Sequence, residues 1–208
     1  MSDQFITFEG GEGAGKSTQI DLLAQTLQHA GKKSVKTREP GGTPEAEAIR
    51  NFIVQGKAGD LTPMTQALLH NAARAEHVDK VIKPYLAQDY WVLCDRFVDS
   101  TLAYQGYGYG LDKAFLNQLA ETVCGGVVPG LTFILDLPVS QGLARVKVKQ
   151  NYEALSLDFH ERVRAGFKSI ASSNPIRYKI VDASQPLENV QAEILSCMTD
   201  RFGLSFLK

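Results

Sequence analysis

The 208-residue sequence predicts an α/β fold, a doubly wound and mostly parallel sheet of about five strands flanked by helices. Two observations predict it. Short apolar runs alternate along the chain with amphipathic helical segments, an order that is typical of a parallel sheet covered on both faces. The length and a hydrophobic content of 44% suffice for one well-buried core and are short for two. We therefore expect a single domain over residues 1–208.

The first strand, residues 5–9, is an apolar run that stops at a glycine-rich turn. Residues 10–17, Gly-Gly-Glu-Gly-Ala-Gly-Lys-Ser, fit the pattern G-x-x-x-x-G-K-[ST], in which backbone N–H groups and the positive end of the next helix bind phosphate. Lys16 would reach the terminal phosphates and Ser17 would ligate Mg²⁺. The alternative, a chance match, is disfavoured by the strand–loop–helix context. The pattern predicts a P-loop NTPase-type fold and these nucleotide-binding residues: Gly10, Gly11, Glu12, Gly13, Ala14, Gly15, Lys16, Ser17 and Thr18.

The first half of the chain continues with periodic helices and one short strand. Helix 16–30 carries Ile20, Leu23 and Leu27 on one face and ends before Gly31. Strand 34–37 is broken by Pro-Gly-Gly, which is incompatible with helix and strand alike. Apolar periodicity then predicts helix 44–54, a loop at 56–63, and a long helix 65–86 that carries His70, Arg74 and His77.

The second half repeats the alternation of strands and helices. Its expected elements are strand 90–94, helix 111–123, strand 131–135, a basic segment 139–150, helix 155–171, strand 178–181 and helix 188–199. Ligands of such sheets bind beyond the carboxyl ends of the strands. We therefore expect residues 10–17, 38–43, 95–104 and Asp136 to meet there.

Two carboxylates end apolar strands. Asp95 has the position of a carboxylate that holds Mg²⁺, directly or through water, in a phosphate-binding-loop enzyme. Its alternative role is that of a strand-end aspartate capping the next turn. Asp136 occupies a similar position, but nothing basic follows it in the sequence, so we expect a cap or an indirect support of the site.

Two groups of side chains have the spacing of one helix face. If Arg96 opens a helix, then Ser100 and Tyr104 share its face and recognise a second, phosphorylated ligand; the alternative is a solvated helix start. His70 and Arg74 are four residues apart and would offer a nucleobase a stacking ring and a fork of donors. The pair alone would more often be ordinary surface.

Arg145, Lys147 and Lys149 alternate with valine in the segment 139–154, which we expect to be a short lid. Without the phosphate loop, a solvated edge would be the better interpretation. With it, added positive charge is needed, because the loop offers only Lys16 while phosphoryl transfer spreads negative charge. Arg145 is favoured because guanidinium bridges phosphate oxygens better than ammonium does.

Composition narrows the function classes. A net charge of −1 disfavours a general nucleic-acid-binding surface. The three cysteines, Cys94, Cys124 and Cys197, lack metal-binding spacing and are expected to be free thiols in a reducing compartment. We see neither a signal peptide nor an uncharged stretch near the roughly 20 residues that cross a bilayer. We expect a cytoplasmic protein with no membrane and no nucleic-acid partner.

Several segments after the phosphate loop resemble those of bacterial thymidylate kinase. They are Thr-Arg-Glu-Pro-Gly-Gly-Thr at 37–43, Ala-Ala-Arg at 72–74, Asp-Arg-Phe at 95–97, Ser-Thr-Leu-Ala-Tyr-Gln-Gly at 100–106 and Asp-Phe-His-Glu-Arg-Val-Arg at 158–164. The resemblance covers essentially the whole chain. The first segment and those at 95–106 are together specific to the family. The resemblance implies a homodimer that transfers the γ-phosphate of ATP to dTMP with Mg²⁺, giving dTDP.

The resemblance also implies roles for individual residues. Glu12 would lie near the dTMP phosphate and sugar, and Tyr104 under the deoxyribose, where it disfavours a 2′-hydroxyl. The lack of an arginine in the phosphate loop resembles the bacterial subclass whose lid supplies that cation. The implied catalytic residues are Lys16, Arg96, Arg145 and Glu12. The implied dTMP-binding residues are Glu12, Arg50 and Arg96 for the phosphate, Arg74, Thr101 and Gln105 for the base, and Arg38, Pro40, His70, Ser100 and Tyr104 around them.

The chain departs from the family pattern at two places. His70 stands where the family usually has the phenylalanine that stacks on thymine. A neutral imidazole still stacks but offers less apolar area, and at low pH it would carry charge. The lid is short and has Lys147 and Lys149 where the subclass often has arginine.

Three other functions compete with dTMP phosphorylation. The nearest is a kinase for another nucleoside monophosphate or for a deoxynucleoside. A GTPase switch is disfavoured because the chain has no Asn-Lys-x-Asp segment. A non-catalytic nucleotide-binding regulator would leave Lys16, Ser17 and Asp95 without a role.

Overall fold

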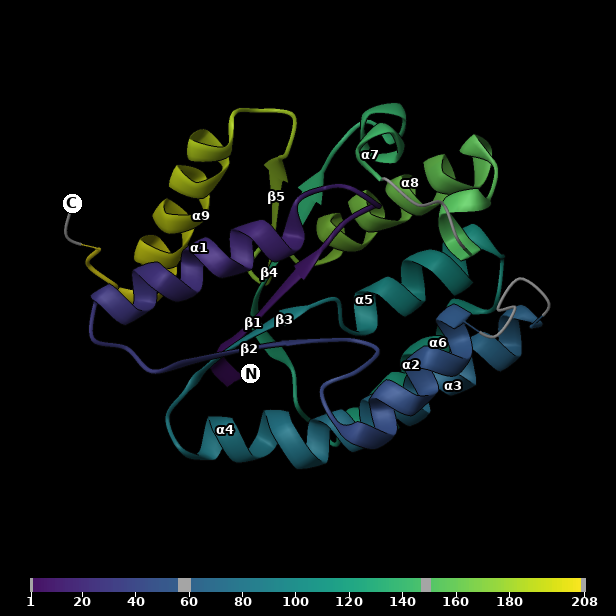
Figure 1. Ribbon diagram of the computed structural model, residues 1–208, viewed down its shortest axis with the longest axis horizontal. Coiled ribbons are helices and arrows are strands. Elements are labelled where there is room, and N and C mark those ends of the chain that lie inside the picture. The colour runs from purple at the N-terminus through teal and green to yellow at the C-terminus, as the bar shows by residue number, and fades with distance from the viewer. Residues whose placement is uncertain (1, 56–60, 147–150, 207–208) are drawn as a thin grey trace.

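The computed structural model describes residues 2–55, 61–146 and 151–206. Residues 56–60 of the expected loop, and Lys147 and Lys149 of the expected lid, lie outside this part of the chain. The described residues form a five-stranded parallel sheet with the strand order β2-β3-β1-β4-β5, which confirms the predicted fold class (Figure 1). The strands are β1 (Ser2–Glu9), β2 (Ser34–Arg38), β3 (Trp91–Asp95), β4 (Pro129–Asp136) and β5 (Tyr178–Asp182).

The central strand β1 determines where the functional loops lie. β1 pairs with β3 on one side and with β4 on the other, so that Phe8 is opposite both Asp95 and Phe133. The order of the strands reverses at β1, because its two neighbours lie on opposite sides of it. Such a reversal opens a crevice at the carboxyl ends of the strands. The glycine-rich loop after Glu9 therefore leaves the sheet beside the segment that follows Asp95.

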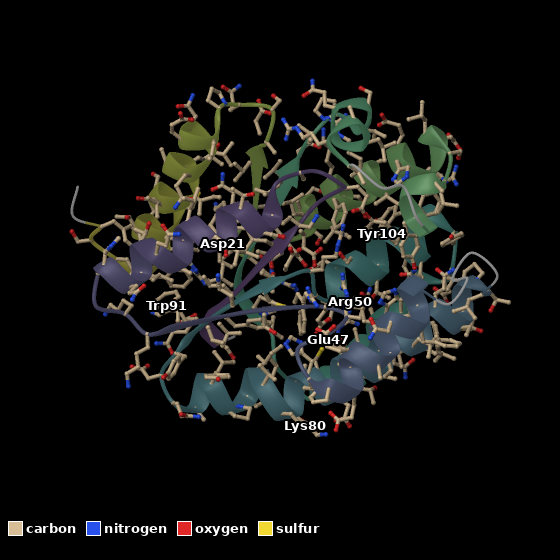
Figure 2. All side chains as sticks on the ribbon, viewed as in Figure 1. Asp21, Glu47, Arg50, Lys80, Trp91 and Tyr104 are labelled. Atoms are coloured by element: carbon tan, nitrogen blue, oxygen red, sulfur yellow. The ribbon has the colours of Figure 1, made fainter. Side chains whose placement is uncertain are left out.

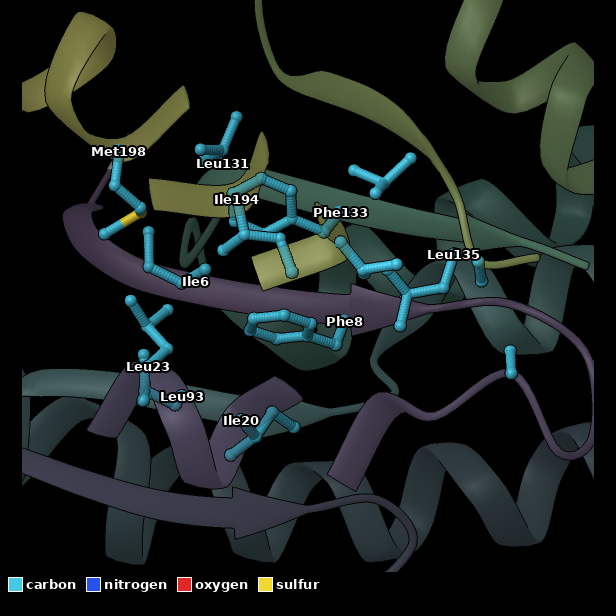
Figure 3. Packing of buried hydrophobic residues seen from close by; sticks show 14 of the residues in the cluster. Ile6, Phe8, Ile20, Leu23, Leu93, Leu131, Phe133, Leu135, Ile194 and Met198 are labelled. Carbon is cyan, nitrogen blue, oxygen red and sulfur yellow. The ribbon is translucent and has the colours of Figure 1, made fainter. Parts of the chain in front are cut away.

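Helices cover both faces of the sheet, because each strand alternates its side chains between them (Figure 1). On one face, Ile6 and Phe8 pack with Leu23 of α1 and with Ile194 and Met198 of α9 (Figure 3). On the other, Phe5, Val92 and Cys94 pack against the helical segments around Val78, Ile82 and Cys124. The helices are α1 (Lys16–His29), α2 (Pro44–Gln55), α3 (Pro63–His77), α4 (Lys83–Ala87), α5 (Val98–Thr101), α6 (Lys113–Cys124), α7 (Val139–Arg145), α8 (Leu157–Ser173) and α9 (Leu187–Phe202).

Two π-helical stretches and a 3₁₀ turn complete the described elements: η2 (Val78–Ile82), η3 (Leu102–Gly108) and η4 (Asn151–Ala154). The helix expected at 65–86 runs through η2 into α4. Pro84 has no N–H to donate, and the N–H of Lys83 just before it donates to the carbonyl of Val78, five residues back. The second stretch, η3, carries Tyr104 and Gln105.

Candidate active site

The phosphate loop connects β1 to α1 through glycines in the left-handed region. Gly13 and Gly15 have φ of 68° and 91°, which residues with a side chain rarely adopt. Gly15 precedes α1 and offers no side-chain cap, so the first N–H groups of this helix remain available to an anion. Lys16 folds back over the loop, and its Nζ donates to the carbonyls of Gly10 at 3.2 Å and Gly11 at 3.0 Å. Burial, followed by the nearby Arg96, lowers the pKa of Lys16.

Helix α7, in the segment that we expected to be a lid, touches the phosphate loop through main chain. A Cβ on Gly13 would lie 2.2 Å from the carbonyl oxygen of Gly142, and a Cβ on Gly142 would lie 2.3 Å from that of Glu12. Glycine is therefore required on both sides of the contact. At the end of α7, the exposed Arg145 donates from Nη1 to the Gly13 carbonyl at 3.3 Å, so this side chain lies beside the loop, as expected from the sequence.

Ser17 and Asp95 present two oxygen ligands at one point. The Ser17 hydroxyl donates to Asp95 Oδ2 at 2.7 Å. Oxygen donors of this kind suit Mg²⁺, which usually takes one or two protein ligands together with phosphate oxygens and water. Among the described residues there is no cluster of three or more His, Cys, Asp or Glu side chains that would enclose a metal ion without such help.

Arg96 lies outside the helix that we expected it to open. Its φ is 69°, in the left-handed region, and α5 begins only at Val98. The expected helical spacing was therefore wrong, yet the three side chains still meet. Arg96 Nη1 donates to Ser100 Oγ at 3.0 Å and Nη2 to the Tyr104 hydroxyl at 3.3 Å. A non-glycine residue with this backbone costs about 1–3 kcal/mol, which is a common feature of functional sites.

Glu12 is the acidic partner of this arginine. Its Oε1 accepts from Arg96 Nη2 at 2.9 Å and from the Tyr104 hydroxyl at 2.7 Å. Burial alone would raise the pKa of Glu12, but Arg96 and Lys16 outweigh burial and lower it to about 2. Glu12 is therefore ionised at neutral pH.

The site consists of two neighbouring cavities. The first follows the phosphate loop from Glu12 to Thr18, with Arg38 and Asp95 also in its wall. The second contains ten of the eleven residues that we expected to bind the acceptor: Glu12, Pro40, Arg50, His70, Arg74, Arg96, Ser100, Thr101, Tyr104 and Gln105.

Arg38, the eleventh, lines the first cavity and is paired with Glu47 at 3.1 Å. Four residues line both cavities: Glu12, Glu39, Arg50 and Arg96. Figure 2 shows Arg50 on α2 and Tyr104 on η3, on different elements around the second cavity. Two arginines thus lie where a phosphate-binding groove meets a second pocket.

Arg74 is almost completely buried in the wall of the second cavity. It donates from Nε to Glu39 at 2.7 Å and from Nη1 to Asn71 at 2.9 Å. Nη2 donates to the Phe97 carbonyl and to the Thr101 hydroxyl, each at 3.1 Å. A guanidinium has five N–H donors, so these contacts within the described chain leave one N–H of Nη1 for a ligand.

Glu39 holds Arg74 in place by pairing with its guanidinium, a role that we did not expect. The carboxylate also lies 3.0 Å from His77 Nδ1, and His77 Nε2 lies 2.6 Å from the Thr37 hydroxyl. Burial would raise the pKa of Glu39, but Arg74 outweighs burial and lowers it. A buried chain of polar groups therefore runs from the end of β2 to the guanidinium. Thr37 and Glu39 belong to the segment 37–43, in which the family resemblance had given individual roles only to Arg38 and Pro40.

His70 stands at the rim of the second cavity beside Tyr152, which our sequence reasoning missed. The Tyr152 hydroxyl lies 3.4 Å from His70 Nε2 and donates to Gln66 Oε1 at 2.7 Å, while Gln105 donates to it at 2.8 Å. Burial and then Arg74 lower the pKa of His70 to about 4. The ring is therefore neutral at neutral pH. No motif marks Tyr152, which lies near the end of the segment 139–154 that we expected to be a lid.

Glu9 is a second missed carboxyl group. It ends β1 and is fully buried. Its Oε1 accepts a hydrogen bond from the backbone N–H of Phe97 at 2.7 Å, and its Oε2 accepts one from the Ser100 hydroxyl at 2.6 Å. Burial, and then repulsion by Asp99, raise the pKa of Glu9 to about 8. Glu9 fixes the start of α5, which carries Ser100 to the site.

Asp136 does have basic partners, contrary to the expectation from its sequence neighbours. Arg164 of α8 donates to both of its oxygens, at 2.6 and 2.9 Å, and Lys168 Nζ lies 2.9 Å from Oδ2. Packing of α8 beside β4 brings these cations in from 28 residues or more along the chain. Asp136 thereby holds α8, the helix after the lid, to the sheet.

Comparisons with known proteins agree with this geometry. A family model described as thymidylate kinase matches residues 8–194. The thymidylate kinase of Magnetococcus marinus is 50% identical over 99% of this chain and 100% of its own length. That of Caulobacter vibrioides is 50% identical over 96% of this chain and 98% of its own. A crystal structure of thymidylate kinase from Ehrlichia chaffeensis superposes with a TM-score of 0.78 at 39% identity, covering 92% of this chain and 96% of that one.

In the described part of the chain, no helix is both long and apolar enough to cross a membrane.

Proposed function

The chain belongs to the thymidylate kinase family, whose members are phosphotransferases, and we propose that it transfers the γ-phosphate of ATP to dTMP, giving dTDP and ADP in the supply of dTTP. The observation that carries the proposal is the junction of the two cavities. Glu12, Arg50 and Arg96 line both the phosphate groove and the second pocket. A phosphoryl group that passes from one nucleotide to the other has to cross this junction.

The donor side would bind ATP through the phosphate loop, residues 10–18. Its backbone N–H groups and Lys16 would hold the phosphates. Ser17 and Asp95 would hold Mg²⁺, whose charge offsets that of the phosphate oxygens and shapes the nucleotide for transfer. The hydrogen bond between these two side chains supports this assignment, because it already brings their oxygens together.

The acceptor side would bind dTMP in the second cavity. Arg50 and Arg96 would hold its phosphate, and Glu12 would orient both that phosphate and the sugar. The base would stack on His70, with the remaining N–H of Arg74 directed to a thymine carbonyl and with Thr101 and Gln105 beside it. Tyr104 would support the deoxyribose, and Pro40 and Ser100 would complete the wall of the cavity. Arg38 would contact dTMP from the side of the phosphate groove.

Transfer itself would need little proton chemistry. An oxygen of the dTMP phosphate forms a bond to the γ-phosphorus of ATP while the bond to the β–γ bridging oxygen breaks and ADP leaves. Lys16, Arg96 and Arg145 would stabilise the charge that spreads over the transferred group, and Glu12 would keep Arg96 in place. Positioning and charge stabilisation are sufficient for such a reaction.

The test is transfer of ³²P from γ-labelled ATP, with dTMP, dUMP, UMP, dCMP and thymidine as alternative acceptors. We expect strong preference for dTMP. Preference for another acceptor would retain the kinase chemistry and reassign the substrate, with His70 as the first residue to change. Binding of both nucleotides without transfer of label would overturn the proposal in favour of a regulator.

We further propose one kinase domain over residues 1–208, with a lid at 139–154, that acts in the cytoplasm as a homodimer. The exposed apolar side chains of Phe52 on α2, Leu68 on α3 and Phe115 on α6 support the dimer, because these helices pack together and leave these side chains on the surface. Light scattering coupled to gel filtration would measure the mass. A wild-type monomer, or a Leu68→Asp variant that dimerises as well as wild type, would contradict the assignment.

A further inference from the structure

His160 of α8 is a buried polar residue that the reaction described above does not use. Its side chain is 4% exposed, and Nε2 has no hydrogen-bond partner among the described residues. A buried nitrogen without a partner is unfavourable, and native proteins commonly satisfy such groups with protein or with ordered water. The position of this nitrogen therefore calls for a ligand.

The His160 ring lines a cavity of about 20 Å³ beneath the phosphate loop. A water molecule needs about 10–15 Å³ and two to four polar partners, so the cavity has room for a water. Polar groups in the lining come from Gly10, Gly11 and Glu12 of the loop and from Asp136 and Arg164. Of these, Asp136 and Arg164 already satisfy each other.

Glu12 offers the acceptor that such a water would use. Both hydrogen bonds to its carboxylate within the described chain end on Oε1, from Arg96 and from Tyr104. Its other oxygen, Oε2, is therefore available, and Glu12 and His160 line the same cavity.

We propose that this cavity is a site for one water, which receives a hydrogen bond from His160 Nε2–H and donates one to Glu12 Oε2. His160 is then a positioning residue: it acts through Glu12 on Arg96 and Tyr104, and so on the acceptor phosphate. This consequence rests on the proposed function, whereas the water site itself does not. The link also joins the phosphate loop to α8, the helix that follows the lid.

Two substitutions separate the hydrogen bond from the space that the ring fills. His160→Gln places an amide nitrogen near the position of Nε2, whereas His160→Met fills a similar volume without a donor. We expect His160→Met to lower kcat/KM for dTMP about tenfold, with KM for ATP within about twofold of wild type, and His160→Gln to restore most of the loss. His29→Met, at an exposed histidine of α1, is the matched control. Thermal melting identifies any variant that does not fold, and His160→Asn, whose amide falls short of Nε2, then replaces His160→Met.

A high-resolution crystal structure gives a readout that does not depend on dTMP. We expect an ordered water within hydrogen-bonding distance of His160 Nε2 and Glu12 Oε2 in wild type, and its loss in His160→Met. A wild-type structure without that water would overturn the site. Equal loss of kcat/KM in the glutamine and methionine variants, or no loss in either, would overturn the positioning role. Failure of the proposed function would appear differently, as a wild-type protein that holds the water but transfers no phosphate to dTMP.

Discussion

The Ser17 hydroxyl donates to Asp95 Oδ2 across 2.7 Å, which joins the first turn of α1 to the last residue of β3. The two residues are 78 positions apart in the sequence. They meet because β1 and β3 are paired in register, with Phe8 opposite Asp95, so that the loop after β1 passes over the end of β3.

Replacement of Asp95 by asparagine tests this pair as a Mg²⁺ site. The amide keeps the shape of the side chain but removes its charge, so we expect the apparent affinity for Mg²⁺ to fall about 10–100-fold. The measurement is the initial rate as a function of Mg²⁺ at saturating ATP and dTMP. Asp200→Asn, at an exposed position of α9, is the control. An unchanged Mg²⁺ dependence would show that Asp95 only caps its turn.

Arg145→Ala tests the cation that we propose the lid supplies. We expect kcat to fall about 10³-fold, the low end of the range for arginines that stabilise a transferring phosphoryl group. KM for dTMP should stay near the wild-type value, because the contact of Arg145 is with the phosphate loop. Single-turnover kinetics would isolate the chemical step, with Arg201→Ala on α9 as the control. A kcat within about threefold of wild type would assign the role to another cation.

His70→Phe tests the residue expected to stack on the base. A phenyl ring offers more apolar contact, so we expect KM for dTMP to fall about 2–10-fold, which corresponds to the usual range for an aromatic pair. In wild type, this KM should not change between neutral pH and about pH 5 on account of His70, whose pKa is about 4. Charging of this ring is thus confined to more acidic conditions than the sequence alone indicated. A KM that rises as His70 titrates near neutrality would contradict the assignment.

Glu9→Gln tests the buried carboxyl group that fixes α5. The pKa of Glu9 is raised from 4.5 to about 8 on folding, so the folded protein binds the extra proton between these values. The stability that Glu9 contributes is therefore fully present below pH 4.5 and is lost as the pH rises through about 8. A glutamine stays neutral, and the variant should show a flatter decline of the free energy of unfolding over this window.

Urea unfolding at several pH values between 4.5 and 8 provides the measurement for Glu9. Glu193→Gln, at an exposed position of α9, is the control. Identical slopes for wild type and Glu9→Gln would mean that the carboxyl group is ionised in the folded protein.

Glu39→Gln tests the buried support of Arg74. Removal of one partner leaves an uncompensated charge inside the protein, and we expect the free energy of unfolding to fall by about 3–5 kcal/mol. KM for dTMP should also rise, because Arg74 loses the group that orients it. Glu45→Gln, whose carboxylate pairs with Lys80 on the surface, is the control and should lower the free energy of unfolding far less. Equal effects of the two substitutions would contradict the role of Glu39.

Features formed by consecutive residues could be predicted from the sequence. The phosphate loop is such a feature. The expected acceptor residues are dispersed along the chain and were implied by the family resemblance; ten of the eleven line one cavity. Arg96 was misplaced relative to its helix, because nothing in an arginine side chain indicates a left-handed backbone. The contacts of Arg164 and Tyr152 were missed because each residue meets a partner remote in sequence: packing of α8 brings Arg164 to Asp136, and the end of the expected lid segment brings Tyr152 to Gln105.

The contact between Gly13 and Gly142 has a mechanical consequence. Main-chain atoms have no rotamers, so a glycine-to-glycine contact contains no side chain that could absorb a displacement. We therefore expect a shift of Gly13 to displace α7, which carries Arg145 at its C-terminal end. Nucleotide binding and the placement of Arg145 should then be coupled, and a Cβ at either glycine should separate α7 from the loop.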